Sequence, residues 1–184
     1  MHHLANSPDT DANIFDDGPP VPVMLEPFKT RGFVCYNTVM NKPRLQELEV
    51  LIGNWNWTLS NAWFLDSLET KVVGTANFEW IDNAFVFWRF KLGTSDVPES
   101  VSVIGYSSPA ERFEVLYYDN RGVSRIFDMS FDGKHWSMLR QDPDFYQRFT
   151  AQVNGDTIAA AWEASEDKGK TWRKDFDLLF TKDK

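Results

Sequence analysis

The chain has 184 residues, which is enough for one domain with a sizeable core. Its net charge of −8 argues against a nucleic-acid-binding or anionic-membrane-binding face, because both depend largely on Lys and Arg. The single cysteine, Cys35, excludes an intramolecular disulfide and a cysteine-based zinc site, and no apolar run reaches the length of a membrane span. We therefore expect a cytoplasmic protein with no metal, no nucleic-acid partner and no membrane partner.

Three segments follow one another along the chain. Residues 1–22 are rich in Asp and Pro, which predicts a disordered acidic leader. Residues 23–42 are more apolar, and we expect them to form an extension that packs on the domain. From residue 43 onwards Leu45, Leu48 and Leu51 recur at helical spacing before Gly53, a residue suited to end a helix. These patterns predict one short helix over 43–51 and a single folded domain over 43–184.

Beyond Gly53 the chain alternates between apolar strand-like runs and turn residues. Hairpin signatures rich in Asp and Gly at 130–136 and 165–172 place the C-terminal half in an antiparallel meander. Because many consecutive antiparallel strands tend to curl or close, we expect an all-β, ten-stranded, antiparallel up-and-down barrel with the short helix plugging one end. The predicted strands are 54–61, 70–80, 84–92, 101–107, 112–119, 123–131, 135–141, 145–154, 157–164 and 172–181.

Side-chain alternation predicts which residues face the barrel interior. Trp55, Trp57 and Leu59 share one face of the first strand, while Asn56 and Thr58 share the other. The interior faces of later strands mix very small residues with very large aromatic ones. Such a mixture is compatible with an interior that is simply filled and with a cavity that has aromatic walls.

Polar side chains also fall on these apolar faces. Arg125, Gln147 and Lys174 each lie in register with inward aromatic residues. A charge inside a barrel requires a partner or water, so each either completes a structural ion pair or contacts a ligand. The run 84–92 is apolar on both faces apart from Arg89 and Lys91, and such a strand needs a cover. The extension or a second subunit would supply it, and we expect a homodimer.

Catalytic motifs are sparse. The pattern at 165–172 matches the Asp box of sialidases, but a single full copy indicates a structural hairpin. The sequence contains no Gly-x-Ser-x-Gly elbow, no His-Glu-x-x-His motif and no glycine-rich phosphate loop. The acid–base candidates for an enzyme are therefore His135, Glu79, Tyr106 and Tyr117.

Several segments carry a family resemblance. They are 51–57, 61–67, 117–123, 127–131, 142–149, 162–165 and 172–178. As a set they resemble an uncharacterised bacterial group of calycin-like barrels, and the resemblance covers residues 45–181. It implies a barrel of the lipocalin and fatty-acid-binding-protein type and brings no established activity. Nitrobindin-like haem barrels also begin in this way, but they use a histidine on a late strand. No histidine follows His135 here, so we expect no cofactor.

These observations lead to one main hypothesis and two alternatives. The main hypothesis is an uncharacterised protein that binds a small, largely apolar molecule inside the barrel, with Arg125 anchoring an anionic or carbonyl group. One alternative is an enzyme of the cyclase, isomerase or hydrolase type acting on such a molecule. The other is a filled structural barrel that acts through its oligomer interface. The predicted ligand-binding residues are Trp57, Trp80, Tyr106, Arg125, Phe149 and Trp162.

Overall fold

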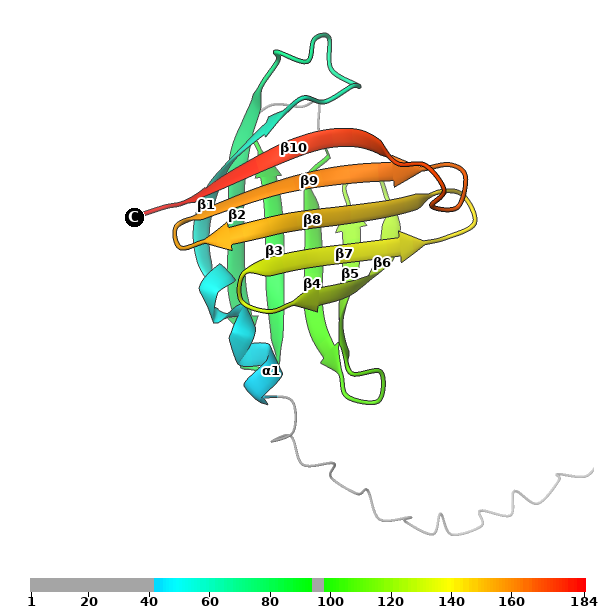
Figure 1. The fold of residues 1–184 in the computed structure, drawn as a ribbon. Helices are drawn as coiled ribbons and strands as arrows, with labels where there is room; N and C mark the ends of the chain where they lie inside the picture. The colour runs from blue at the N-terminus through cyan, green and yellow to red at the C-terminus, as the bar shows by residue number, and fades with distance from the viewer. Residues whose placement is uncertain (1–41, 94–97) are drawn as a thin grey trace, which may run out of the picture. The chain divides into compact units, whose positions relative to one another are not determined.

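The computed structural model describes residues 42–93 and 98–184. A short helix α1 (Lys42–Gln46) continues as a 3-10 helix η1 (Glu47–Leu51) and leads into the strands (Figure 1). The leader predicted at 1–22 and, apart from residue 42, the extension predicted at 23–42 lie outside the described residues. Ten strands follow in this described part: β1 (Gly53–Ser60), β2 (Val72–Ile81), β3 (Phe85–Leu92), β4 (Ser100–Ser107), β5 (Arg112–Asp119), β6 (Ser124–Phe131), β7 (His135–Gln141), β8 (Tyr146–Asn154), β9 (Thr157–Ser165) and β10 (Arg173–Lys182).

The strands form one closed antiparallel barrel. Each strand pairs with the next along the chain, and β1 also pairs with β10 to close the ring. The predicted all-β up-and-down barrel with one short helical segment is confirmed, and no predicted strand boundary differs from the structure by more than two residues. No helix in the described ranges is long and apolar enough to cross a membrane.

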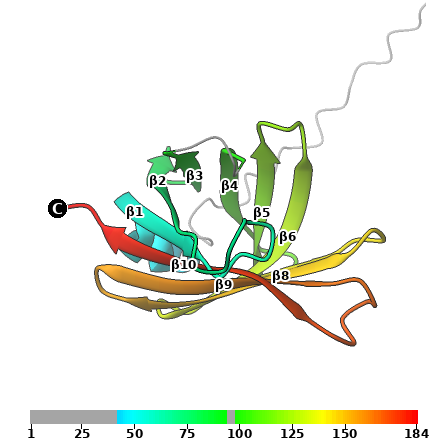
Figure 2. The same cartoon turned by 90° about the horizontal axis from the view of Figure 1, so that it is seen from above.

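The barrel is flattened into two walls. Figure 1 shows β7–β10 running across the direction of β2–β6, and Figure 2 shows the two walls from above. The walls meet at β6 and β7, where the described residues form four ladder pairs, from Asp128 opposite Leu139 to Phe131 opposite Trp136. The first half of β6 therefore lacks ladder partners on β7. We name this gap in the ladder, between residues 124–127 and residues 140–141, the seam.

The helical segment closes one end of the barrel. Leu45, Leu48 and Leu51 are buried, and the indole Nε1 of Trp55 donates a hydrogen bond to the Leu51 carbonyl over 2.8 Å. Gly53 follows with a φ of 126°, a backbone conformation that side chains rarely allow. The predicted stop after the helix is thus the point where the chain turns into β1. We refer to this closed end as the helix end and to the other as the open end.

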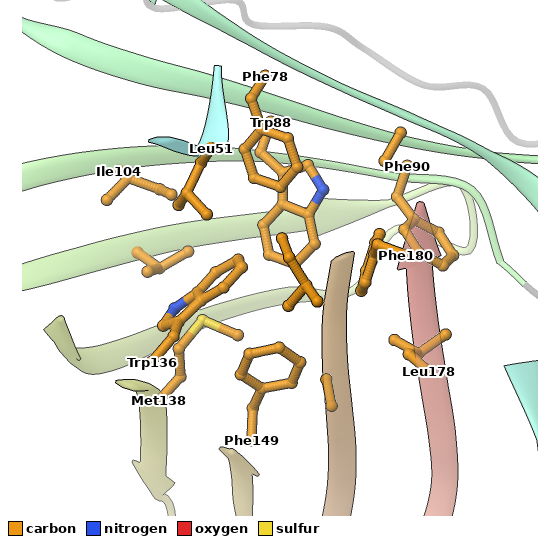
Figure 3. Close-up of a cluster of buried hydrophobic side chains, with 14 of the residues drawn as sticks. Leu51, Phe78, Trp88, Phe90, Ile104, Trp136, Met138, Phe149, Leu178 and Phe180 are labelled. Atoms are coloured by element: carbon orange, nitrogen blue, oxygen red, sulfur yellow. The ribbon is translucent and has the colours of Figure 1, made fainter. Parts of the chain in front are cut away.

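Large buried aromatic side chains pack against one another in the barrel interior (Figure 3). Phe78 stacks on Trp88 with ring centroids 5.1 Å apart, and Trp136 meets Phe149 edge-on at 4.8 Å. Trp136 and Phe149 expose at most 1% of their surface. Phe78, Trp136 and Phe149 belong to this packed interior and do not line the cavity described below.

The alternation predicted for the strands holds, with one correction on β10. Trp55, Trp57 and Leu59 are buried, as expected for one face of β1. Lys174, however, is exposed, and its Nζ donates to Asp177 over 2.8 Å. The register of β10 against β9 shifts between Lys174 and Phe176, which turns the lysine outward.

Candidate functional site

A cavity of about 790 Å³ occupies the open end of the barrel. Its volume lies within the usual range for small-molecule sites, roughly 300–1,000 Å³. The wall is mainly apolar, and polar side chains reach it from β4, β5, β6, β8 and β10 and from the loops between strands. The principal aromatic residues are Trp88, Phe90, Phe127, Trp162 and Phe176, and the polar ones include Ser102, Tyr117, Arg125 and Gln147.

Two of the predicted ligand-binding residues, Arg125 and Trp162, line this cavity. Trp57 and Phe149 do not, because both are buried in the packed interior, where Trp57 stacks on Phe90 with centroids 4.1 Å apart. All four side chains face the barrel interior, and two of them line the cavity.

The other two predicted residues lie at the helix end. The indole Nε1 of Trp80 donates to the carboxylate of Glu49 on η1 over 2.9 Å. The ring of Tyr106 packs edge-on against Phe113 at 5.1 Å, close to the guanidinium of Arg44. Neither residue is part of the cavity wall, so the structure places both with the cap of the barrel.

A loop that the sequence prediction missed covers part of the cavity. Trp63 and Phe64, between β1 and β2, both contribute to the wall. The Trp63 indole donates to the Asp175 carboxylate over 3.0 Å, and the Arg173 guanidinium lies 4.1 Å from its ring centroid. Phe64 packs edge-on against Phe176 at 5.7 Å. The sequence signal that could have indicated this contact is a pair of adjacent aromatic residues in a loop. Loops are mostly polar, so large apolar side chains in them usually pack against another part of the protein.

Arg125 is the main electrostatic feature of the cavity. Its Nη1 donates to Oε1 of Gln147 over 2.8 Å, and its guanidinium lies 5.2 Å from the ring centroid of Phe145. Among the described residues no carboxylate lies within ion-pair distance of it. Burial lowers the pKa of Arg125, and the nearby positive charge of Arg140 lowers it further. An arginine stays charged regardless, so the cavity contains a cation without a carboxylate partner.

The other basic groups in the wall or next to it are paired with carboxylates. The pairs are Arg121 with Asp119 at 2.7 Å, Arg140 with the wall residue Asp144 at 2.7 Å, and Arg173 with Asp175 at 3.7 Å. The remaining acidic wall residue, Glu166, is exposed to solvent. Within the part of the chain that the structure describes, Arg125 therefore differs from these arginines in having a neutral amide and no carboxylate as its hydrogen-bond partner.

Tyr117 and Asp119 form a second polar contact at this end. The Tyr117 hydroxyl donates to Oδ2 of Asp119 over 3.0 Å. Burial and then the Asp119 charge raise the pKa of Tyr117 to about 12. Burial alone would raise the pKa of Asp119, but hydrogen bonds from Arg121 and Tyr117 outweigh it and lower that pKa. At neutral pH the tyrosine is protonated and the aspartate is ionised.

The remaining acid–base candidates lie away from the cavity. His135 is exposed at the β6–β7 hairpin, where its Nδ1 is 2.9 Å from the Asp132 carboxylate. Glu79 is exposed on β2. The described residues contain no cluster of His, Cys, Asp and Glu with the arrangement of a metal site.

Arg125 and Gln147 meet across the seam. Arg125 lies on β6 and Gln147 on β8, and Arg140 of β7 lies between these two strands in the sheet order. Both guanidinium groups approach the Phe145 ring, with Arg140 at 4.8 Å from its centroid. Side chains thus bridge the barrel where the backbone ladder is interrupted, and the unpaired cation lies at that bridge.

Comparison with known proteins identifies the fold and no more. No family model matches the chain, and no curated protein matches its sequence. Among solved structures, the crystal structure of Rv2717c from M. tuberculosis is similar, with a TM-score of 0.55 and 12% identity. The similarity covers 77% of this chain and 98% of that one. At this level of identity the likeness shows a shared barrel fold, which is compatible with a small-molecule binder.

Proposed function

We propose that the protein binds a small, largely apolar molecule with one anionic group in the cavity at the open end. The observation that carries this proposal is Arg125, a half-buried cation that faces the cavity and has, among the described residues, the Gln147 amide as its hydrogen-bond partner and no carboxylate. Leaving a charge partly desolvated without a counter-charge is unfavourable, and an anionic ligand would relieve that cost. A carboxylate is a suitable group, because its two oxygens match the fork of a guanidinium.

The rest of the wall supports an apolar body for this ligand. Trp88, Phe127 and Met138 line the cavity on the side of the helix end, whereas Arg125 and Gln147 are each the second residue of a strand that starts at the open end. The ligand would therefore enter with its apolar part first and leave its anionic group at the seam. Aromatic walls with a few placed polar groups are typical of such sites.

The proposal also covers the family of the protein and its place in the cell. The closed barrel, the helical plug and the Gly53-x-Trp55 start of the first strand support membership of a calycin-like group. A single cysteine in the sequence is typical of cytoplasmic proteins, so we infer a cytoplasmic location.

An enzyme is the second candidate function, and the contact between Tyr117 and Asp119 favours it. A tyrosine hydroxyl within hydrogen-bond reach of a carboxylate at a cavity is a possible acid–base pair. The pKa of Tyr117 is raised and that of Asp119 is lowered, however, so both are moved away from the neutral range in which an acid–base catalyst works best. The binding function therefore has the stronger support. The alternative of a filled structural barrel has less support, because a cavity of about 790 Å³ lies inside the barrel.

The first experiment is native mass spectrometry of gently purified protein beside a denatured sample. A retained ligand would appear as a mass excess that is lost on denaturation. The second is a fluorescence titration with dansylaminoundecanoic acid and with its methyl ester, which differ only in the charge of one end. We expect the acid to bind more tightly than the ester.

Variants connect that preference to the cavity. Arg125→Gln should weaken binding of the acid by about tenfold or more and leave ester binding nearly unchanged, because a hydrogen bond to a charged group contributes about 1.5–3 kcal/mol. Arg112→Gln, on the outer face of β5, is the matched control and should change neither. If the wild-type protein binds neither probe, the binding function is wrong. If it binds both equally, only the anionic part of the proposal fails.

A further inference from the structure

The outer face of β3–β6 carries a row of apolar side chains. Phe87 lies opposite Val103, Val103 opposite Leu116, and Leu116 opposite Ile126, so the row crosses four strands without interruption. Ile126 exposes 62% of its surface. Phe85 and Tyr118 flank the row and are also exposed. We name these six residues the outer patch.

The opposite wall shows that this composition is a local feature. At the corresponding positions of β7–β9 the outward residues include Ser137 opposite Thr150, and Arg148 paired with Glu163 at 2.6 Å. A solvated sheet face is normally polar in this way. An apolar row several strands wide on a soluble domain usually marks an interaction surface.

Charges of opposite sign lie at two diagonal corners of the outer patch. Arg89 and Lys91, on β3 towards the open end, form no ion pair with any described residue. Glu114 and Asp128, on β5 and β6 towards the helix end, share a single cation, Arg112, at 3.2 and 3.0 Å. The first corner also holds Glu99, which lines the same surface pocket as Arg89 and Lys91, so this corner has one positive charge in excess and the other has one negative charge in excess.

We propose that a second copy of this chain covers the outer patch and that the two copies form a two-fold symmetric dimer. An interface between identical copies must be complementary to itself. A two-fold axis in the plane of the interface, along the diagonal that joins the other two corners, brings the basic corner of each copy against the acidic corner of its partner. The apolar row then meets the apolar row at the centre.

The register fixes the angle of this arrangement. Arg89 and Asp128 are separated by the three steps from β3 to β6, each about 4.8 Å, and by four residues along the strand, each about 3.4 Å. Both separations are roughly 14 Å, so the charged diagonal lies at about 45° to the strands. The strands of the two copies then cross at nearly a right angle, which is one of the two usual ways for sheets to pack.

The experiment is the oligomeric mass of the full chain, measured by light scattering during size-exclusion chromatography over a concentration series. We expect twice the chain mass of 21.3 kDa. Ile126→Lys should convert the protein to a monomer. Leu179→Lys is the matched control, since Leu179 is similarly exposed, at 50%, on the outer face of β10, and this variant should remain a dimer. Thermal unfolding of both variants verifies that each is folded.

Charge reversal tests the orientation. Arg89→Glu and Asp128→Arg should each raise the dimer dissociation constant by about tenfold or more, because like charges then meet across the interface, and the double variant should restore it. A monomeric wild-type protein would overturn the proposal and leave the outer patch to another occupant. A dimer that survives Ile126→Lys would also overturn it, because the subunits would then meet elsewhere. Failure of the double variant to restore the dimer would overturn the diagonal geometry.

Discussion

The two ends of the barrel use the same strands and the same alternation of side chains but differ in what they enclose. At the helix end, Trp136, Phe149 and the leucines of η1 are buried, and none of them lines the cavity. At the open end, the ladder between β6 and β7 stops, and a cavity of about 790 Å³ remains. The difference indicates that the cap and the continuous ladder, and not the number of aromatic residues, decide whether this barrel is solid or hollow.

Truncation of one aromatic residue at each end tests this comparison most directly. Trp136→Ala should lower the free energy of unfolding by about 3–5 kcal/mol, because it leaves a void in a packed region. Phe176→Ala, at the wall of the existing cavity, should cost about half as much or less, since one side of that ring already lacks close neighbours. Urea unfolding of both variants measures the difference, and equal losses would show that the open end is as tightly packed as the helix end.

Hydrogen exchange sharpens the comparison along a single strand. The amides of residues 124–127 that face the seam should exchange at least roughly tenfold faster than those of residues 128–131, because the latter are paired with β7. Residues 112–119 of β5, which pair with their neighbours over most of their length on both sides, serve as the internal reference. Uniform protection along β6 would contradict the existence of the seam.

The smallest expected effect concerns the β9–β10 hairpin at the open end. Hydrogen bonds from the Thr171 side chain and backbone lower the pKa of Asp167 to about 2. Because the folded-state pKa lies below the unfolded value, this group contributes stability above about pH 4 and loses it as the pH falls towards 2. Asp167→Asn should therefore flatten the dependence of the melting temperature on pH in that window. The adjacent exposed variant Glu166→Gln is the control, and an identical pH profile for Asp167→Asn and wild type would contradict the prediction.

The fold was largely predictable from local signals. Turn residues such as Asp119, Gly122 and Gly155 mark the strand ends, and alternation around Trp55 and Trp57 identifies the inward face. Both signals act over a few residues, so a single sequence carries them. The inward orientation predicted for Lys174 was wrong, because the register shift that turns it outward depends on the pairing of β10 with β9 and not on the local sequence.

The site was predictable only in part. Alternation placed both Trp57 and Trp162 inside the barrel but could not show that one is packed against Phe90 while the other faces the cavity. Arg125 and Gln147 were each predicted to point inward. Their contact depends on the end of a ladder between β6 and β7, which is a property of the whole sheet.

The seam also has a consequence for the range of ligands. The described part of the first half of β6 has no ladder pairs with β7, so we expect a change in the spacing of the two walls there to disturb side-chain contacts, such as that of Arg125 with Gln147, and no backbone ladder. We therefore expect the width of the cavity to change at a small cost in free energy. The position of Arg125, in contrast, is fixed on β6. We expect a binding protein that tolerates variation in the shape of its ligand while remaining strict about where the ligand carries its charge.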